Sequence, residues 1–279
     1  MTPGTGQSRA ARLFLLAPQA ILVVVFFACI SALVWKSFYS GGQLSFGTYA
    51  DILTRETYQR VMIRTVVISL VTTALCVLIG YPIAYTLARS RYRNYLLILL
   101  ITPWLVSLVV RTFAWMIILG NTGLINWLLI SAGITGAPIK FMFNPVGIVI
   151  GLVHVFVPFM VIAILSVLML IDRSLEEASM SLGAGPARTF LRVVWPLSLP
   201  GVFSGIALVY LMSSGAIVTP LLLGGLRDRM MGTQIYQEIF QVFNVERASA
   251  MAILLLVSSI VVILPLMMVE RKFRRARGS

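Results

Sequence analysis

The sequence predicts an all-α integral membrane protein with six transmembrane helices. Of its 279 residues, 59% are hydrophobic and only 11% are charged, whereas soluble domains carry about 25% charged residues. The apolar residues gather in blocks close to the roughly 20 residues that a helix needs to cross a bilayer. Because lipid offers no hydrogen-bond partners, each block is expected to be a helix. The blocks form one transmembrane domain over 1–279 and comprise 13–35, 65–88, 95–119, 146–171, 197–223 and 250–269.

The first block, 13–35, follows Arg9 and Arg12, as the apolar part of a secretory signal peptide would. Its apolar run is longer than the roughly 7–15 residues typical of such a peptide, and no small-x-small cleavage site follows it. We therefore expect this block to be a retained first helix.

The basic residues indicate how the chain crosses the membrane. The 22 Lys and Arg against nine Asp and Glu give a net charge of +13. Basic residues concentrate near the N-terminus, on the segments after the second and fourth blocks, and in the tail ERKFRRARGS. This is the positive-inside pattern, so both termini are predicted to lie in the cytoplasm. Since topology near anionic lipid explains the charge, no nucleic-acid partner is expected.

Three segments are predicted on the external side: 36–64, 120–145 and 224–249. The middle segment contains TGLINWLLISAG, which is too short to span a bilayer but apolar enough to lie along an interface or fold back into the protein. In the last segment, Ile235, Ile239 and Val242 recur at helical spacing. A short amphipathic helix there would either cap a pathway or shield the top of the bundle, and periodicity favours shielding.

Residue types that carry chemistry are sparse inside the blocks. Cys29 and Cys76 have neither metal-site nor disulfide spacing, so both are interpreted as small packing residues. His154 lies mid-block without an acid to complete a proton relay, and we expect a neutral histidine bonded to a neighbouring helix. The sequence contains no Walker loop and no paired metal-binding carboxylates. We therefore expect no metal, no cofactor and no enzymatic activity in this chain.

The predicted cytoplasmic loop 172–196 is the only one long enough to fold. Ser174 and Glu177 have the spacing of a capping box, which starts a helix, and Glu176 also suits the first-turn dipole. The helix is predicted to end just before Gly183, the natural residue after a helix C-terminus.

A second helix is predicted to follow at once. Pro186 suits its first position, and Pro196 is expected to break it before the fifth block. Small residues would let another surface approach closely: Ala178, Ser179 and Ser181. Apolar side chains offer anchors: Leu175, Leu182, Phe190 and Leu191. The pattern leaves two interpretations open, a helix that docks into a groove of a cytoplasmic partner and a connector packed on its own bundle.

This loop resembles the EAA loop of ATP-binding-cassette (ABC) importer permeases. Glu177-Ala178-Ser179 is followed by Gly183 and then by Val193-Val194-Trp195-Pro196, where the family has Glu-Ala-Ala, Gly and Ile-x-Leu-Pro. The bulky Trp195 departs most from that pattern and is expected to alter the exit of the second helix. The resemblance implies a coupling helix seated in a cleft of an ATPase subunit that binds ATP and Mg. The implied coupling residues are Glu176, Glu177, Ala178, Ser179, Leu182, Gly183, Ala184, Gly185 and Phe190.

Two further stretches narrow the resemblance. VRTFAWMIILGNTGLINWLL (110–129) and VTPLLLGG (218–225) are similar to the first of two inner-membrane permeases in spermidine/putrescine-type importers. This similarity implies a type I ABC importer permease fold in a bacterial inner membrane, importing a polyamine, an opine, an aminophosphonate or another small solute. It also implies three kinds of protein partner: nucleotide-binding ATPase subunits, a second related permease forming a heterodimer, and a periplasmic or extracellular solute-binding protein.

Arg111 is the one charge inside a block. A buried cation in a membrane is expensive and is a functional-site hypothesis by default. It would lie in the pathway or at the second permease, or it would reach toward the outer surface, and we favour a structural or gating role. Because no block contains an acid, a cationic cargo would depend on aromatic faces. The candidates are Trp104, Trp115 and Tyr210, with Trp127 near the external mouth, although each one singly is more often a packing residue.

Two other classes of protein fit less well. A secondary transporter would carry ion-coupling carboxylates or broken helices in two repeated halves, and the sequence has neither such acids nor a persuasive repeat. A membrane-embedded enzyme would carry a cluster of Asp, Glu or His at the membrane face, which the sequence also lacks.

Overall fold

The computed structural model of the chain describes residues 5–40, 43–225 and 227–275, so the end of the basic tail, 276–279, lies outside the described part. Five of the described helices have 20 residues or more: α1 (Thr5–Ser37), α3 (Glu56–Arg89), α7 (Pro145–Leu168), α10 (Trp195–Ser214) and α13 (Val245–Arg275). The shorter ones are α2 (Gly47–Thr54), α4 (Arg93–Leu105), α5 (Leu108–Leu119), α6 (Leu124–Ser131), α8 (Arg173–Ser181), α9 (Pro186–Thr189), α11 (Val218–Leu223) and α12 (Met231–Phe240). A π-turn, η1 (Phe190–Val194), joins α9 to α10, and β1 (Tyr39–Ser40) pairs antiparallel with β2 (Gln43–Leu44).

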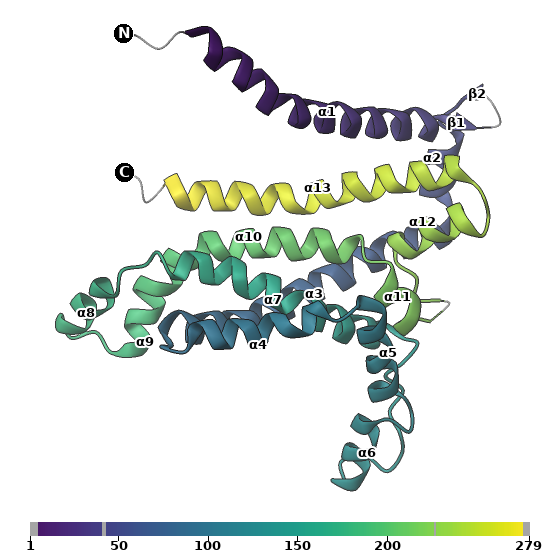
Figure 1. Ribbon diagram of the computed structural model, residues 1–279. Coiled ribbons are helices and arrows are strands. Elements are labelled where there is room, and N and C mark those ends of the chain that lie inside the picture. The colour runs from purple at the N-terminus through teal and green to yellow at the C-terminus, as the bar shows by residue number, and fades with distance from the viewer. Residues whose placement is uncertain (1–4, 41–42, 226, 276–279) are drawn as a thin grey trace.

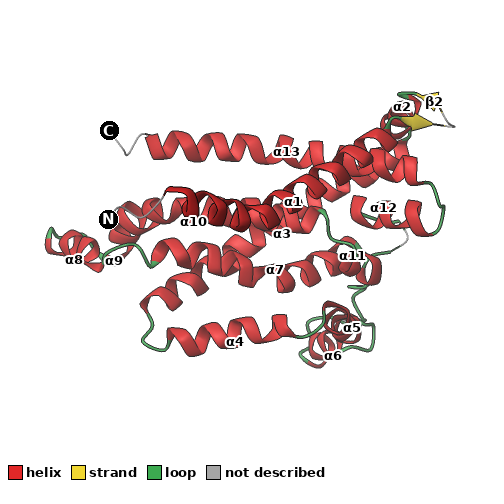
Figure 2. Ribbon diagram, turned by 45° about the horizontal axis from the view of Figure 1, so that its top comes forward, coloured by secondary structure: helices red, strands yellow, loops and turns green. Residues whose placement is uncertain are grey.

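The long helices run side by side and give the molecule two ends (Figure 1). Helices α8 and α9 lie at one end, together with the start of α1 and the end of α13, whereas α2, α11 and α12 lie at the other (Figures 1 and 2). Helix α4 follows the bundle, but α5 and α6 turn away from it at the end opposite α8. The two ends of the described chain therefore share one side with the loop 172–196.

Six helical segments of the described chain are long and apolar enough to cross a membrane by length and composition: Pro18–Ser37, Glu56–Arg89, Leu108–Ser131, Pro145–Leu168, Pro186–Ser214 and Val245–Glu270. The predicted fold class is confirmed, and which termini face the cytoplasm stays a prediction. Several helices extend past the apolar blocks and include polar residues at their ends, as α3 does at Glu56–Arg89.

The third block, expected as one helix over 95–119, is interrupted. Helix α4 ends at Leu105, Val106 and Ser107 are extended, and α5 starts at Leu108. Pro103 lies just before the break, and a proline removes one helical hydrogen bond and crowds the preceding turn. The segment that is long and apolar enough to cross a membrane here is 108–131, which comprises α5 and α6.

The fifth block, expected over 197–223, is also two helices. Helix α10 ends at Ser214, and α11 begins at Val218. A continuous helix would place the ring of Pro220 against the carbonyl of Ala216, one turn earlier. In the observed structure Pro220 lies in the first turn of α11, where the missing N–H leaves no hydrogen bond broken.

Helices α3, α7 and α10 form the centre of the bundle. Leu152, Met160 and Ile164 of α7 are buried among side chains of the other two helices. A Cβ atom on Gly205 of α10 would lie 2.5 Å from the Met160 Sδ, and one on Gly80 of α3 would lie 3.0 Å from its Cγ. Small residues at such crossings let membrane helices approach closely. This centre supports both helices that carry the loop 172–196.

The predicted amphipathic helix is α12, but its buried face includes polar side chains as well as Met231. Gln234 and Glu238 are buried, whereas Val242 lies beyond the helix and is exposed. The Tyr58 hydroxyl and Gln234 Nε2 donate to Glu238 Oε1 at 3.3 and 3.2 Å, and Arg247 Nη1 lies 3.5 Å from Oε2. We call these four residues the Glu238 network. It fixes α12 to α3 and α13.

Helix α1 stands apart from the central helices. It contacts the bundle through α13, and side chains along its length, such as Val24 and Phe27, are more than half exposed. Its tip is tied to α2 by a hydrogen bond from the Tyr49 hydroxyl to Ser37 Oγ at 2.7 Å.

Candidate functional site

The loop 172–196 folds as two helices, α8 and α9, joined by a tight turn at Gly183. Gly183 has a φ of +84°, its N–H donates to the Met180 carbonyl at 2.9 Å, and the Ala184 N–H donates to the Ser179 carbonyl at 3.2 Å. This pair of bonds is the Schellman arrangement that closes a helix C-terminus. The predictions that the first helix ends before Gly183 and that Pro186 starts the second are confirmed.

The predicted capping box at the start of the loop is wrong. Helix α8 begins at Arg173, two residues earlier than a cap at Ser174 would allow, and its N-cap is Asp172. The Asp172 carboxylate accepts a hydrogen bond from the Ser174 N–H at 2.9 Å, which lowers the pKa of this carboxyl below its ordinary value. Asp caps a helix as well as Ser does, and here it comes first along the chain.

Pro196 does not break the second helix, contrary to expectation. Helix α9, the π-turn and α10 follow one another without an intervening loop. The Trp195 N–H donates to the Phe190 carbonyl five residues back, which widens the turn. The wider turn accommodates the Pro196 ring, which would crowd the carbonyl one turn earlier in a regular helix. Helix α9, the π-turn and α10 therefore form one continuous helical segment.

An aromatic cluster fixes this helical segment to α3. The Trp195 ring lies 4.9 Å from the Tyr81 ring, and Phe190 packs edge-on against Tyr81 and Tyr85 at 5.8 and 5.4 Å. The Tyr81 hydroxyl shares a hydrogen bond with Ser198 Oγ at 2.7 Å. Trp195 therefore completes an anchor and leaves the exit of the helix continuous. Phe190, expected on the docking surface, is half-buried in the same anchor.

Polar contacts hold α8 against the rest of the chain. Glu176 forms an ion pair with Arg89 at the end of α3, with side-chain exposures of 15% and 22%. Arg173 Nη2 donates to the Arg89 carbonyl at 3.3 Å. Ser179 Oγ and Thr189 Oγ1 lie 3.0 Å apart and join α8 to α9. Glu176 and Ser179, both expected at the coupling surface, thus bond within their own chain.

The tip of the loop exposes apolar side chains. Leu182 is 89% exposed, and Leu175 and Met180 are each 47% exposed. Four other expected coupling residues are exposed and one is half-buried: Glu177, Ala178, Gly183 and Gly185, then Ala184. None of the residues of α8 is buried. An apolar surface on a short, rigidly mounted helix is suited to a groove on another protein.

Both helix breaks line one cavity within the bundle. This cavity has a volume of ≈ 600 Å³ and is bordered by 104–108, by 215–219 and by α7. A second cavity of ≈ 550 Å³ is lined by Trp115 and His154 among others. Trp104 and Arg111 border both cavities. Mostly apolar walls with a few polar groups are typical of sites for small solutes.

Arg111 forms hydrogen bonds to the backbone at the break between α4 and α5. Its Nη2 donates to the Val106 carbonyl at 2.8 Å and to the Trp104 carbonyl at 3.3 Å. These carbonyls are unpaired because the helix stops there, and a cation at a helix C-terminus is favourable. Its Nε has no hydrogen-bond partner among the described residues. This geometry supports the structural role that the sequence favoured for Arg111.

The other expected pathway residues are dispersed. Trp115 packs edge-on against His154 at 5.5 Å, and the His154 Nδ1 has no hydrogen-bond partner in the described chain, so the expected bond to a neighbouring helix is not seen at that atom. Tyr210 is 1% exposed and lines neither cavity, whereas Trp127 on α6 is 63% exposed. Over the described ranges, no group of three His, Cys, Asp or Glu is placed to hold a metal ion.

Residues 76–275 match the family described as the binding-protein-dependent transport system inner membrane component. The chain belongs to this family. It is therefore an ABC importer permease, and ATP hydrolysis is carried out by a separate subunit. The resemblance of the chain to ABC importer permeases is thereby confirmed.

The permease is similar in sequence to two known permeases and in fold to one solved transporter. It is 31% identical over 242 residues to the spermidine/putrescine transport system permease protein PotB of Haemophilus influenzae, covering 86% of this chain and 83% of the relative. It is 32% identical over 218 residues to the molybdenum transport system permease protein ModB of Mycobacterium bovis, covering 76% and 80%. The fold matches a bacterial alginate ABC transporter solved with its alginate-bound periplasmic protein, with a TM-score of 0.73 and 18% identity over 96% of this chain and 98% of the other.

Proposed function

We propose that this permease is a pore-forming subunit of an ATP-driven, binding-protein-dependent importer in a bacterial inner membrane, with a polyamine such as spermidine or putrescine as its cargo. Nucleotide-binding ATPase subunits, which hold ATP and Mg, bind its cytoplasmic side. A second, related permease completes the pore, and an external solute-binding protein delivers the cargo. The termini and the loop 172–196 face the cytoplasm.

The observation that carries this proposal is the apolar tip of α8 on a rigid mount. Leu182 contacts almost nothing within its own chain, whereas Phe190 and Trp195 lock the following helix to α3. An ATPase subunit that grips the tip would move α9 and α10 together. Because α10 leads to the break that lines the ≈ 600 Å³ cavity, closure of the ATPase would reach the pore and alternate its access.

The docking role is tested by the substitution Leu182→Asp. Leu182 is 89% exposed, so the carboxylate costs the isolated permease little, but it would bury an unpaired charge in the proposed cleft. Leu44→Asp is the matched control, because Leu44 is 65% exposed in β2 at the opposite end. We expect Leu182→Asp to lose the co-purifying ATPase subunit and solute uptake, while Leu44→Asp keeps both. A Leu182→Asp complex with a full ATPase complement and normal uptake would refute the docking role.

The cargo assignment is supported by the PotB relative and by aromatic faces near the cavities. Trp104 and Trp115 border cavities whose linings contain no Asp or Glu, so an ammonium group would be attracted by ring faces. Arg111 is engaged with backbone carbonyls and is proposed to shape the pathway rather than bind cargo.

The cargo is tested by uptake of labelled spermidine into proteoliposomes that contain the native complex and its binding protein. Competition with molybdate, an opine and an aminophosphonate tests the alternative solutes, since the ModB relative is as similar in identity as PotB. Saturable spermidine uptake that unlabelled putrescine inhibits supports the assignment. If only another solute inhibits uptake, that solute replaces spermidine as the assigned cargo, and the importer role is unaffected.

A further inference from the structure

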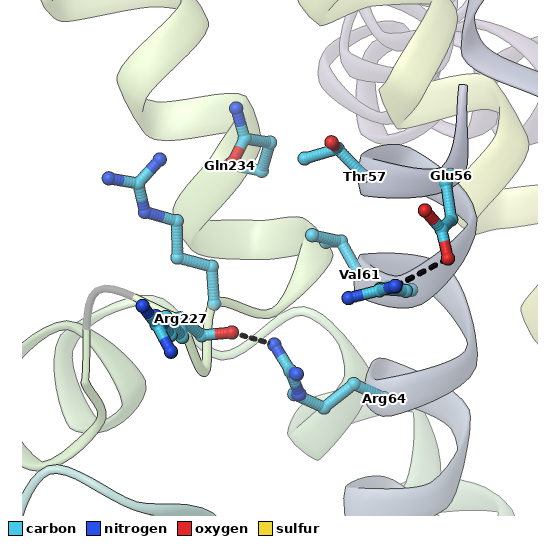
Figure 3. Close-up of a pocket in the computed structure, with 8 residues that line it drawn as sticks. Glu56, Thr57, Val61, Arg64, Arg227 and Gln234 are labelled. Carbon is cyan, nitrogen blue, oxygen red and sulfur yellow. Dashed lines mark hydrogen bonds and ion pairs between the residues drawn. The ribbon is translucent and has the colours of Figure 1, made fainter.

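A pocket of ≈ 440 Å³, whose lining residues are drawn in Figure 3, opens beside the starts of α3 and α12, at the end of the bundle opposite α8 (Figure 1). The first turns of α3 form one side of it, and the segment 227–229 before α12 forms the other. Four arginines and one acidic residue line it: Arg60, Arg64, Arg227, Arg229 and Glu56.

Two of these guanidinium groups are compensated within the chain. Arg60 forms an ion pair with Glu56, and Arg64 Nε lies 3.7 Å from Asp228 Oδ1. The side chains of Arg227 and Arg229 have no acidic partner among the described residues. Arg227 is exposed and Arg229 is half-buried. The pocket therefore keeps two positive charges without a counter-charge.

The two sides of the pocket are held together by hydrogen bonds. Arg64 Nη1 donates to the Arg227 carbonyl across the pocket (Figure 3). The Met231 N–H donates to Thr65 Oγ1 at 2.8 Å, in a buried position just behind the pocket. The Glu238 network fixes α12, whose Gln234 also lines the pocket. Because the backbone that carries the arginines is held in place, binding of an anion would cost little conformational entropy.

The position of the pocket determines which molecules can reach it. Arg64 and Arg89 are separated along one helix by about 38 Å, at 1.5 Å per residue, which exceeds the roughly 30 Å of a bilayer core. Since Arg89 contacts α8 at the proposed cytoplasmic end, the pocket faces the exterior. Its charge would repel a polyamine, so the cargo itself is not its ligand. The family depends on an external binding protein, which must dock at this end.

We infer that the arginine pocket receives carboxylate side chains from an acidic patch of the external solute-binding protein. Paired guanidinium and carboxylate groups form strong, directional hydrogen bonds, and complementary charge speeds encounter. The segment 227–229 connects α12 to α11, and α11 begins at the break that lines the ≈ 600 Å³ cavity. A carboxylate bound here would therefore contact both α3 and the chain leading to the cavity. This inference rests on the proposed importer function.

The test compares complexes reconstituted in nanodiscs and titrated with their cargo-loaded binding protein, obtained by co-purification with the native complex. Stimulation of ATP hydrolysis gives the half-saturating concentration of the binding protein. In the double variant Arg227→Glu/Arg229→Glu we expect this concentration to rise at least about ten-fold at low salt, and the difference to shrink at about 0.5 M salt because screening shortens the reach of the charges. Lys140→Glu is the control for the single variant Arg227→Glu, since it makes the same charge change at an exposed position outside the pocket.

Each outcome decides the inference. Because the Arg227 side chain is exposed and unpaired in the described chain, Arg227→Glu alone should fold and should raise the half-saturating concentration about three-fold. Equal half-saturating concentrations in the wild-type and both variants would refute the docking role of the pocket and leave the proposed importer function intact. The same equality, together with binding of citrate to the wild-type but not to the double variant, would reassign the pocket to free anions. A wild-type complex that its binding protein does not stimulate would overturn the proposed function and this inference together.

Discussion

The turn at Gly183 gives the sharpest prediction about coupling. Gly183 has a φ of +84°, whereas Gly185, two residues later, has a φ of −69°. A Cβ atom added at either glycine would meet no atom within 4 Å. Gly183→Ala and Gly185→Ala therefore differ in backbone conformation and not in crowding. They form a matched pair that isolates the left-handed turn.

The magnitude follows from that conformation. A left-handed backbone costs an L-residue about 1–2 kcal/mol, which Gly185→Ala avoids because its φ suits any residue. If the whole cost falls on the turn, the ratio of molecules with the turn formed to those without it decreases by a factor of about 5–30. The apparent affinity for the ATPase subunit falls by the same factor at most, because only the competent conformer binds. Asn tolerates this conformation better, so Gly183→Asn should lie between the two alanine variants.

The assay measures ATPase-subunit affinity for each detergent-purified permease complex, followed by solute uptake in proteoliposomes. We expect weak affinity and low uptake for Gly183→Ala, intermediate values for Gly183→Asn and wild-type values for Gly185→Ala. Each variant should insert and purify in equal amounts, because the turn lies outside the packed centre. Identical affinity and uptake for the two alanine variants would refute the view that the left-handed turn presents the docking surface.

Three further experiments test the contacts that support the sites. A double-mutant cycle of Arg89→Ala and Glu176→Ala should give a coupling energy of about 1 kcal/mol in thermal unfolding, and strict additivity would show that the pair contributes nothing. Arg111→Ala should lower stability by about 1–3 kcal/mol in the same assay, because it leaves two backbone carbonyls unpaired, and an unchanged melting temperature would argue against that bracing role. Glu238→Gln should cost about 1–3 kcal/mol by leaving Arg247 without its partner, and a gain in stability would contradict the importance of the Glu238 network.

Much of the fold follows from local rules that the sequence displays. Apolar length alone predicts the helical membrane domain, and Gly183 and Pro186 predict the turn in the loop 172–196, because a left-handed residue and a helix-starting residue are local requirements. Pro196 was misjudged because whether a proline breaks a helix depends on the turn before it, and the π-turn there is stabilised by packing against α3.

The parts that sequence reasoning missed depend on contacts between distant segments. Arg89 lies 87 residues before Glu176. The arginine pocket is formed by two segments more than 160 residues apart, which a contact between Arg64 and Arg227 links. The two helix breaks are also invisible to apolar periodicity, since 95–119 and 197–223 are predominantly apolar on both sides of each break. Only the fold reveals that Arg111 bonds the carbonyls that one break leaves free. The sequence pattern does not reveal that Gln234 and Glu238 are buried, because their burial is made favourable by hydrogen bonds among Tyr58, Gln234 and Glu238.

The position of α1 has a consequence for the order in which the molecule is built. Helix α1 is synthesised before α13, the helix through which it meets the bundle. The stretch Pro18–Ser37 must therefore reside in lipid without this neighbour until α13 has been translated. Its mean hydropathy of 2.2 and its many exposed apolar side chains make it stable in contact with lipid alone. Since chains emerge from the ribosome N-terminus first, α1 gains this neighbour only after α13 has been translated.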